Sequence, residues 1–328
     1  MKPYVVITKK IPQHVETFIA DHCRYIKWED QGTMPMDMIL EHLPKADGLL
    51  TASHTINEKL LAHAPQLKVV STLSVGYNHF DIEAMRARNV LGTNTPGVLN
   101  ETVADLIFSL MLATARRIPE MDQYIRQGKW TSSLPESMFG LDVHHKTLGI
   151  VGLGGIGEAV AHRAKWGFDM NILYHNRSRK PELEDKLDAK YCTLEQLLIE
   201  ADFIVLMTPL TKDTYHLIGK EQFALMKPTS IFINASRGAT VDEDALVEAL
   251  QTKQIYAAGL DVFKKEPIDP SHPLLTLPNV VLLPHIGSAT QETRDAMALL
   301  AAQNLVTALQ GKCPPNLVKE LYDLFEHH

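Results

Sequence analysis

Thr147–Gly157, with the sequence TLGIVGLGGIG, is the stretch around which the chain is organised. It begins with a short apolar run, which is typical of a strand buried on both faces of a parallel sheet. The run leads directly into the glycine motif Gly152-x-Gly154-x-x-Gly157, and a helix-like segment follows at 158–166. This order of strand, glycines and helix is that of a dinucleotide-binding turn.

Each glycine of the motif has a separate purpose in such a turn. The first allows a tight turn, the second lets a pyrophosphate approach the backbone, and the third allows close helix–strand packing. The helix N-terminus adds free N–H groups and a positive dipole end. Glycines at this spacing also occur in ordinary packing turns, but their placement between strand and helix favours a cofactor site. The expected cofactor-binding residues here are Gly152, Leu153, Gly154, Gly155, Ile156 and Gly157.

The bulk properties narrow the class of protein. A length of 328 residues is enough for two domains, and a net charge of −7 argues against nucleic acid as a partner. The 3 cysteines are scattered, which fits a reducing compartment and argues against a disulfide framework or a metal site. A strand-like run opens the chain, and neither a signal peptide nor a membrane span is recognisable. We expect a cytoplasmic protein, and we give no function to the terminal Glu-His-His.

The chain alternates strand-like and helix-like segments, which predicts α/β architecture with parallel sheets. Strand-like runs at 4–8, 48–51, 68–72 and 90–93 predict one unit, and runs at 147–151, 171–174, 203–207, 230–234, 257–260 and 280–283 predict a second. An apolar segment at 100–117 predicts a buried connecting helix, and 128–145 is expected to be an irregular surface connection.

A helical pattern at 290–309 is expected to return to the first unit. We therefore predict two doubly wound parallel-sheet domains, with a Rossmann cofactor domain inserted into a flavodoxin-like substrate domain. The substrate domain comprises 1–99 and 290–328, and the NADP-binding domain comprises 100–289.

The residues after the second strand of the cofactor domain indicate which nicotinamide cofactor is bound. A carboxylate about 20 residues past the glycines accepts from the ribose 2′-OH of NAD, whereas arginine accommodates a 2′-phosphate. Here the segment is Asn176-Arg177-Ser178-Arg179, and no carboxylate occurs before Glu182. These side chains favour NADP(H), with NAD(H) still possible. The alternative is a solvated loop of cations.

Three later stretches carry polar side chains at or just past the ends of predicted strands, where open α/β sheets hold ligands. Arg237 can pair with a substrate carboxylate and polarise a carbonyl. His285 suits proton delivery to a forming alkoxide, and Glu266 can accept from the other imidazole nitrogen. Most of the 15 histidines must be surface or core residues, but the Pro-His-x-Gly-Ser context distinguishes His285. We predict a catalytic set of Arg237, Glu266 and His285.

These motifs carry a family resemblance. Gly152-x-Gly154-x-x-Gly157, Asn234-x-x-Arg237-Gly238, Asp261-Val262-x-x-x-Glu266-Pro267 and Pro284-His285-x-Gly287 together resemble the D-isomer-specific 2-hydroxyacid dehydrogenase family over nearly the whole chain. Residues 74–79, 116–117, 128–130 and 285–290 look most like its glyoxylate/hydroxypyruvate reductase branch, which includes 2-ketogluconate reductases. Tyr77-Asn78 departs from the family pattern, which leaves the substrate preference open.

The resemblance implies further roles. The N–H groups of Val75 and Gly76 should hold the substrate carboxylate, although their pattern alone also fits a plain strand end. Asp261 should bond the carboxamide, and Ser288 should bond the substrate or support His285. The residues implied at the cofactor are Thr102, Thr208, Pro209, Ala235, Ser236, Arg237, Asp261, His285 and Gly287. A homodimer is also implied.

The predicted function is NADPH-dependent reduction of a small 2-oxo acid, such as glyoxylate, hydroxypyruvate or 2-ketogluconate, to the D-2-hydroxy acid. Two alternatives stay open: oxidation of phosphite or of another D-2-hydroxy acid, and a non-catalytic NAD(P)H-sensing protein that resembles corepressors of the same fold. The size of the acyl-chain pocket depends on loops around Leu99, Met138 and Ser53–His54, whose geometry the sequence does not reveal.

Overall fold

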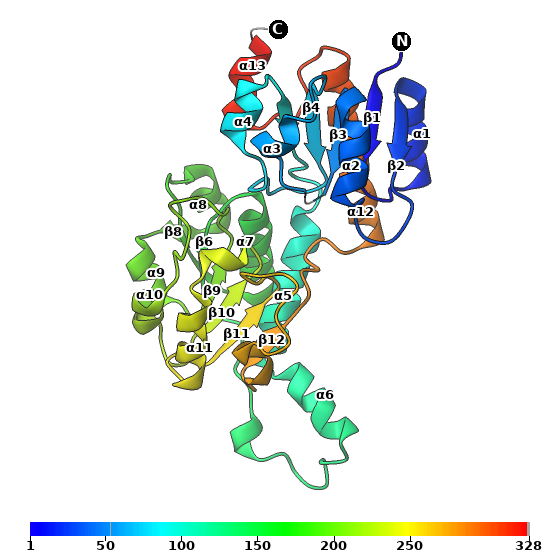
Figure 1. Cartoon of the computed structure of the whole chain (residues 1–328). Helices are drawn as coiled ribbons and strands as arrows, with labels where there is room; N and C mark the ends of the chain where they lie inside the picture. The colour runs from blue at the N-terminus through cyan, green and yellow to red at the C-terminus, as the bar shows by residue number, and fades with distance from the viewer. Residues whose placement is uncertain (53, 327–328) are drawn as a thin grey trace. The chain divides into compact units, whose positions relative to one another are not determined.

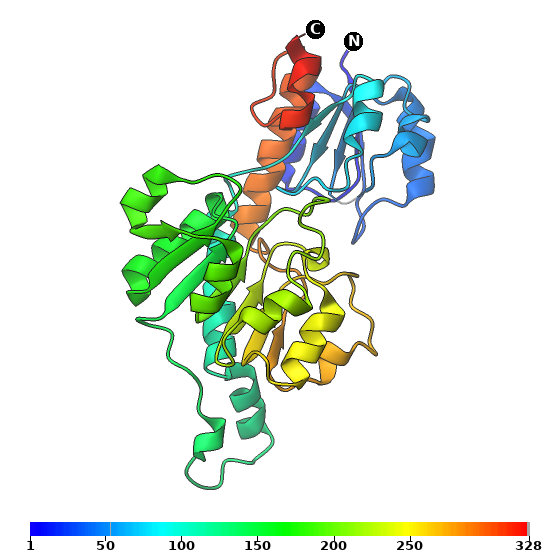
Figure 2. The same ribbon diagram turned by 90° about the vertical axis from the view of Figure 1, so that its left-hand side faces the viewer.

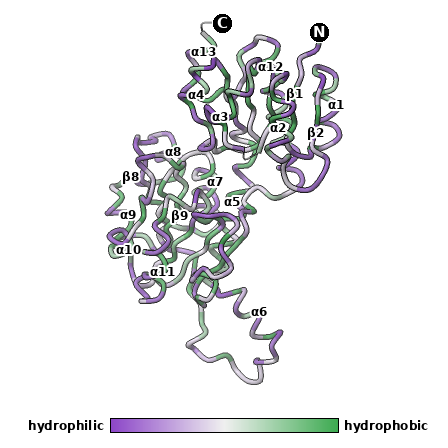
Figure 3. Tube along the Cα trace, viewed as in Figure 1, coloured by the Kyte–Doolittle hydropathy of each residue, from purple (hydrophilic) through white to green (hydrophobic). Residues whose placement is uncertain are grey.

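Buried apolar runs form the strands of two separate parallel sheets (Figures 1 and 3). The computed structural model describes residues 1–52 and 54–326, so Ser53 and the terminal His327-His328 lie outside the described residues. The chain divides into unit 1, Met1–Leu99 with Ala289–His328, and unit 2, Asn100–Ser288. The predicted class of two parallel-sheet α/β units is confirmed.

Unit 1 contains a five-stranded parallel sheet in the order β2-β1-β3-β4-β5, which is the flavodoxin-like order. Its strands are β1 (Tyr4–Ile7), β2 (Arg24–Lys27), β3 (Gly48–Thr51), β4 (Val69–Thr72) and β5 (Leu91–Thr93). Its helices are α1 (Gln13–His22), α2 (Met36–His42), α3 (Glu58–Leu61), α4 (Ile82–Ala87), α12 (Gln291–Leu309) and α13 (Tyr322–Glu326). Helix α12 returns from the end of the chain to pack against β3, β4, β5 and α1 (Figure 2). This matches the expected return of the C-terminal helix.

Unit 2 contains a seven-stranded parallel sheet in the order β12-β11-β10-β9-β6-β7-β8. Read from β8, this is the dinucleotide-binding order with one further strand at the far edge. The strands are β6 (Thr147–Val151), β7 (Asn171–His175), β8 (Ala189–Tyr191), β9 (Phe203–Leu206), β10 (Ile231–Asn234), β11 (Ala257–Leu260) and β12 (Val280–Leu282). The helices are α5 (Asn100–Ala115), α6 (Ile118–Arg126), α7 (Gly155–Phe168), α8 (Pro181–Leu187), α9 (Leu194–Glu200), α10 (Lys220–Leu225) and α11 (Glu243–Gln251).

Helix α5 packs against α7 and against β10, β11 and β12, as expected of an apolar helix without glycine or proline. Among the described residues, no helix is both long enough and apolar enough to cross a membrane. After α5, the segment containing α6 extends away from the sheet of unit 2 (Figures 1 and 2). Four of its large apolar side chains are more than half exposed: Ile118, Ile125, Trp130 and Phe139. The sequence predicts an irregular connection at 128–145, and the short 3-10 turn Glu136–Met138 is the regular element found there.

Candidate active site

The glycine motif forms the turn between β6 and α7. Gly152 adopts φ +106°, and a Cβ there would lie 2.8 Å from the backbone carbon of Met207. A Cβ at Gly157 would lie 2.7 Å from the Gly152 oxygen, whereas one at Gly154 would meet nothing within 4 Å. The first and third glycines therefore permit backbone packing, and the second faces open space. Helix α7 begins at Gly155, so its N-terminal N–H groups are presented at this turn.

The side chain of Asn176 closes the glycine turn from the end of β7. Its Oδ1 accepts from the Leu153 N–H at 2.6 Å, and its Nδ2 donates to the Leu153 oxygen at 3.2 Å. Asn176 thus uses both ends of its amide to hold the turn, and it fixes the backbone of a residue predicted to bind the cofactor.

The two arginines predicted to hold a 2′-phosphate differ in their surroundings. Arg179 pairs with Glu184, with 3.0 Å between its Nε and Oε1, and its guanidinium lies 5.9 Å from the centre of the Tyr191 ring. Arg177 is exposed and, among residues 1–52 and 54–326, has no ion-pair or hydrogen-bond partner. Hydrogen bonds from Arg179 and Tyr174 lower the pKa of Glu184, so this carboxylate stays ionised beside Arg179. Arg177 is the cation available to a ligand.

A buried asparagine shapes the turn that carries Arg237 at the end of β10. The Asn234 Oδ1 accepts from the Ser236 N–H at 3.0 Å and from its hydroxyl at 2.9 Å, and the Asn234 Nδ2 donates to the Arg237 oxygen at 3.2 Å. The guanidinium of Arg237 donates through Nη1 to the Ser236 oxygen at 2.7 Å. Burial lowers the pKa of Arg237, and the charge of Glu266 opposes that shift. Arginine nevertheless stays protonated at any physiological pH.

His285 and Glu266 form a direct pair after β12 and β11. The Nδ1 of His285 lies 2.7 Å from Oε2 of Glu266, whose Oε1 accepts from the Phe263 N–H at 3.0 Å. Burial of Glu266 opposes ionisation, but the hydrogen bonds from His285 and Phe263 and the charges of His285 and Arg237 lower its pKa below the ordinary value. Since Nδ1 is engaged, Nε2 is the nitrogen of His285 that can face a substrate. The structure thus brings together Glu266 and His285, the two residues that the sequence predicts to act as a pair.

Asp261 ties the His285 loop to the end of β11. It is 1% exposed, and its two carboxylate oxygens accept from the N–H groups of Ile286 at 2.8 Å and Gly287 at 2.9 Å. Burial raises the pKa of Asp261. His285 itself adopts φ +54°, a left-handed conformation that is uncommon outside glycine and is held here by its neighbours.

In unit 1, the loop after β4 leaves two backbone amides without partners. The Val75 oxygen accepts from the Asn94 side chain at 2.7 Å, and the Gly76 oxygen accepts from the Ser74 hydroxyl at 2.7 Å. Within the described part of the chain, the N–H groups of Val75 and Gly76 have no hydrogen-bond partner. Both carbonyls are therefore fixed, and both N–H donors remain available to an anion. Sequence reasoning missed Asn94, for which the only signal was a polar residue directly after a buried strand.

The remaining predicted residues lie in unit 2. Thr102 is half-buried in the first turn of α5, and Pro209 is exposed in the loop after β9. The hydroxyl of Thr208 is buried and has no partner among the described residues. Ser288 is half-buried and forms no hydrogen bond with His285 there, so the structure shows no support of His285 by Ser288. Ala235, Ser236 and Gly287 lie in the turns already described. No cluster of potential metal ligands occurs among residues 1–52 and 54–326.

The chain is similar to known proteins over almost its full length. Residues 108–287 match a family model described as D-isomer specific 2-hydroxyacid dehydrogenase, NAD binding domain. A glyoxylate/hydroxypyruvate reductase B of Escherichia fergusonii is 49% identical over 318 residues, which cover 97% of this chain and 98% of that protein.

Two solved structures have the same architecture. A Thermus thermophilus protein is 42% identical, with a TM-score of 0.88 over 96% of this chain and 99% of its own. An NADPH-dependent glyoxylate/hydroxypyruvate reductase from Sinorhizobium meliloti, in complex with NADP and malonate, is 33% identical, with a TM-score of 0.85 over 98% of each chain.

Proposed function

The chain belongs to the D-isomer-specific 2-hydroxyacid dehydrogenase family, and from this premise we propose that it reduces glyoxylate or hydroxypyruvate to the D-2-hydroxy acid with NADPH. The name of the Escherichia fergusonii relative supports these substrates, and 2-ketogluconate is a further candidate. The observation that carries the proposal is the pair of His285 and Glu266, with 2.7 Å between Nδ1 and Oε2 and with Arg237 close enough for its charge to act on Glu266.

The residues of unit 2 fit a nicotinamide dinucleotide. Gly154 faces open space beside the N-terminus of α7, and the buried hydroxyl of Thr208 has no partner among the described residues. A pyrophosphate would accept from the N–H groups of this turn. Among the described residues, the Arg177 side chain has no ion-pair or hydrogen-bond partner, so it would pair with a 2′-phosphate. This supports a preference for NADPH over NADH. When bound, the cofactor supplies the hydride.

The side chains of unit 2 provide the charge and the proton that the reaction needs. Arg237 stabilises the negative charge that develops on the carbonyl oxygen. His285 delivers a proton from Nε2 to that oxygen, because its Nδ1 is held by Glu266. Glu266 fixes the orientation of the imidazole and stabilises its protonated form. Asp261 holds the loop of His285 through two backbone N–H groups, so that His285 stays in position.

Unit 1 supplies a separate group to the substrate. The free N–H groups of Val75 and Gly76 bind the carboxylate of the 2-oxo acid, as backbone amides do in anion sites. Asn94 and Ser74 fix the carbonyls of Val75 and Gly76, so that the N–H donors of the same two residues are preorganised. Binding of the carboxylate at fixed donors selects 2-oxo acids over plain aldehydes and ketones.

We also propose that the protein is a cytoplasmic homodimer. The exposed apolar side chains of Ile118, Ile125, Trp130 and Phe139 in the segment that extends from unit 2 support an interface with a second copy. Cys23, Cys192 and Cys313 are all free, which is in keeping with a reducing compartment. Light scattering after size exclusion should give twice the chain mass, and Ile125→Glu should shift it toward the monomer.

The test of function follows the absorbance of NADPH and NADH during incubation with glyoxylate, hydroxypyruvate, 2-ketogluconate and pyruvate. We expect NADPH oxidation, and His285→Ala should lower kcat by about 100-fold or more. His63→Ala, an exposed histidine in unit 1, is the matched control and should retain wild-type kcat. If His285→Ala retained kcat, the assigned proton donor would be wrong. Binding of NADPH without turnover of any acid would favour a sensor.

A further inference from the structure

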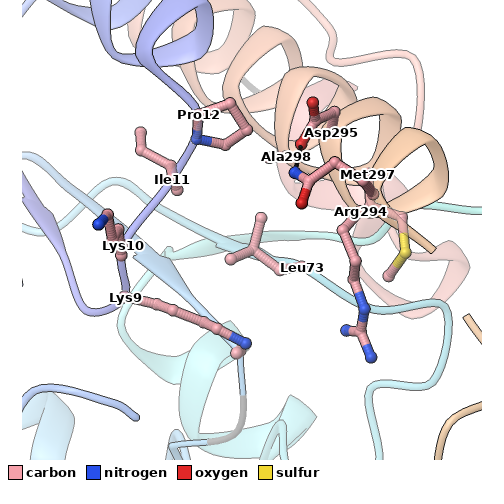
Figure 4. Close-up of a pocket in the computed structure, with 11 residues that line it drawn as sticks. Lys9, Lys10, Ile11, Pro12, Leu73, Arg294, Asp295, Met297 and Ala298 are labelled. Carbon is pink, nitrogen blue, oxygen red and sulfur yellow. Dashed lines mark hydrogen bonds between the residues drawn. The ribbon is translucent and has the colours of Figure 1, made fainter. Parts of the chain in front are cut away.

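Unit 1 contains a pocket of about 490 Å³ that the proposed reaction does not yet use (Figure 4). It lies where β1, β3 and β4 end and α12 begins, which is the edge at which parallel α/β sheets hold ligands. The lining residues that matter for its chemistry are Lys9, Leu73, Gln291, Arg294, Asp295 and Met297. Leu73 precedes Val75 by two residues and Gly76 by three, so at most about 7 Å of chain separates Leu73 from Val75 and at most about 11 Å separates it from Gly76.

Two cations are directed into this pocket. The side chains of Lys9, just after β1, and Arg294, in the first turn of α12, extend into the same space (Figure 4), and Lys10 also belongs to the lining of the pocket. Neither Lys9 nor Arg294 forms an ion pair among residues 1–52 and 54–326. The nearby carboxylate of Asp295 accepts from the amide of Gln291 at 2.6 Å. The lining contains three cationic side chains, Lys9, Lys10 and Arg294, and the one carboxylate of Asp295, so its net charge is positive.

The two cations also act on each other. Burial, and then the charge of Arg294, lower the pKa of Lys9. Holding like charges near each other at a partly buried site is unfavourable, and an anion between them would remove that cost. The walls formed by Leu73 and Met297 are apolar, which strengthens any ion pair formed inside. A neutral hydroxyl would accept a hydrogen bond but would leave the charge uncompensated.

We propose that this pocket is a subsite for a second carboxylate, so that the enzyme also accepts 2-oxo dicarboxylic acids, with Lys9 and Arg294 as the residues that bind the distal group. The proposal rests on the proposed function, because it takes the 2-carboxylate to be held by the Val75 and Gly76 amides. Lys9 and Arg294 then determine specificity for the distal carboxylate of the substrate, and they do not act on the reacting carbonyl.

The test compares two substrates of equal chain length, 2-oxoglutarate and 2-oxopentanoate, which differ only in a carboxylate for a methyl group. We expect the wild type to favour 2-oxoglutarate in kcat/KM. Lys9→Gln and Arg294→Gln should each lower that preference by about 10-fold or more, because each removes a charge-assisted bond to the distal carboxylate. Lys45→Gln makes the same change of charge at an exposed lysine of unit 1 that does not line the pocket, and it is the matched control. Melting temperatures verify that each variant is folded.

Each result decides the proposal. The proposal is overturned if the wild type does not favour 2-oxoglutarate over 2-oxopentanoate in kcat/KM, or if this preference is unchanged in both the Lys9 and the Arg294 variant. An equal effect of Lys45→Gln would show that only the general charge of unit 1 matters, which also overturns it. Glyoxylate has no tail, so its reduction tests the proposed function separately. If no 2-oxo acid were reduced, calorimetric binding of 2-oxoglutarate to the wild type and to Arg294→Gln would still decide whether the subsite exists.

Discussion

A side chain at Gly238 would place its Cβ 1.8 Å from the backbone carbonyl carbon of Phe263. The chain after β10 therefore touches the chain after β11 directly, backbone against backbone. The Phe263 N–H donates to Oε1 of Glu266, and Arg237 precedes Gly238, so this contact sets the position of two predicted catalytic groups relative to each other. No L side chain fits here without movement of one of the two loops.

We therefore expect Gly238→Ala to impair both stability and catalysis. The new Cβ must displace the Phe263 backbone, which moves Glu266 away from His285 and is expected to lower kcat by about 10-fold or more. The melting temperature should fall as well, since overpacking costs about 1–3 kcal/mol. Gly167→Ala in α7 is the control, because a Cβ there meets nothing within 4 Å. A Gly238→Ala variant with wild-type kcat would mean that this contact does not position the site.

Asn176 and Arg177 should affect cofactor binding in different ways. Asn176→Ala removes both hydrogen bonds to Leu153 and loosens the glycine turn, which every nicotinamide dinucleotide must use. We expect KM to rise by a similar factor for NADPH and NADH. Arg177→Gln removes only the free cation, so KM should rise about 10-fold or more for NADPH and little for NADH. Steady-state kinetics with both cofactors separate the two effects.

The control for this pair is Arg179→Gln. Arg179 is already paired with Glu184, so we expect its loss to change the NADPH preference less than the loss of Arg177. If Arg179→Gln reduced the preference as strongly as Arg177→Gln, the ion pair with Glu184 would have to open in the complex. Equal KM values for both cofactors in the wild type would contradict the proposed preference for NADPH.

The sequence predicted most of the fold because central strands are short apolar runs bounded by turns. The prediction missed β2 and β8, which lie at the edges of their sheets. β2 has the sequence RYIK and is nowhere fully buried, and β8 has only three residues. An edge strand needs no continuous apolar pattern, because only one side of it pairs and its faces are partly solvated. Helix α6 was also missed, since none of its residues is buried.

From the sequence, the site could be predicted only where a residue type within a recognisable motif indicates a chemical role. Arg237, Glu266 and His285 follow strands, and the type of each side chain suggested its role. The supporting contacts could not be derived, because they join residues far apart in sequence: Asn94 with Val75, and Asp261 with the N–H groups of Ile286 and Gly287. Tyr77 is a further example. Its departure from the family pattern left the substrate preference open, and the acceptor of its hydroxyl, Glu320 at 3.1 Å, could not be derived from the sequence.

Asn94 should affect substrate affinity more than the chemical step. Its side-chain amide donates to the Val75 backbone oxygen at 2.7 Å. Its backbone oxygen accepts from the side-chain amide of the buried Asn304 at 3.0 Å. Asn94→Ala frees the loop whose amides we propose hold the carboxylate. We expect KM for glyoxylate to rise about 10-fold, with kcat changed less. Asn94→Asp keeps the size of the side chain but cannot donate, so it should not restore KM. A fall in kcat alone would contradict a role in carboxylate binding.

Tyr77 gives a prediction in alkaline solution. Burial, together with the charge and hydrogen bond of Glu320, raises the pKa of Tyr77 from 10.0 to about 12. A group whose pKa is raised in the folded state stabilises that state fully below its unfolded pKa, and this contribution is lost as the pH rises from about 10 toward 12. The loss is at most about 1.4 kcal/mol per pH unit, and partial exposure of the ring reduces it.

The stability difference between the wild type and Tyr77→Phe should therefore shrink as the pH rises above 10, the ordinary pKa of tyrosine. Phenylalanine keeps the ring packed but has no proton to lose, so only the wild type has this extra alkaline instability. Urea unfolding at a series of pH values measures the difference. Tyr215→Phe, which changes an exposed tyrosine in unit 2, is the control. A constant difference across this range would show that the Tyr77 hydroxyl titrates alike in the folded and unfolded chain, and that Glu320 does not hold its proton.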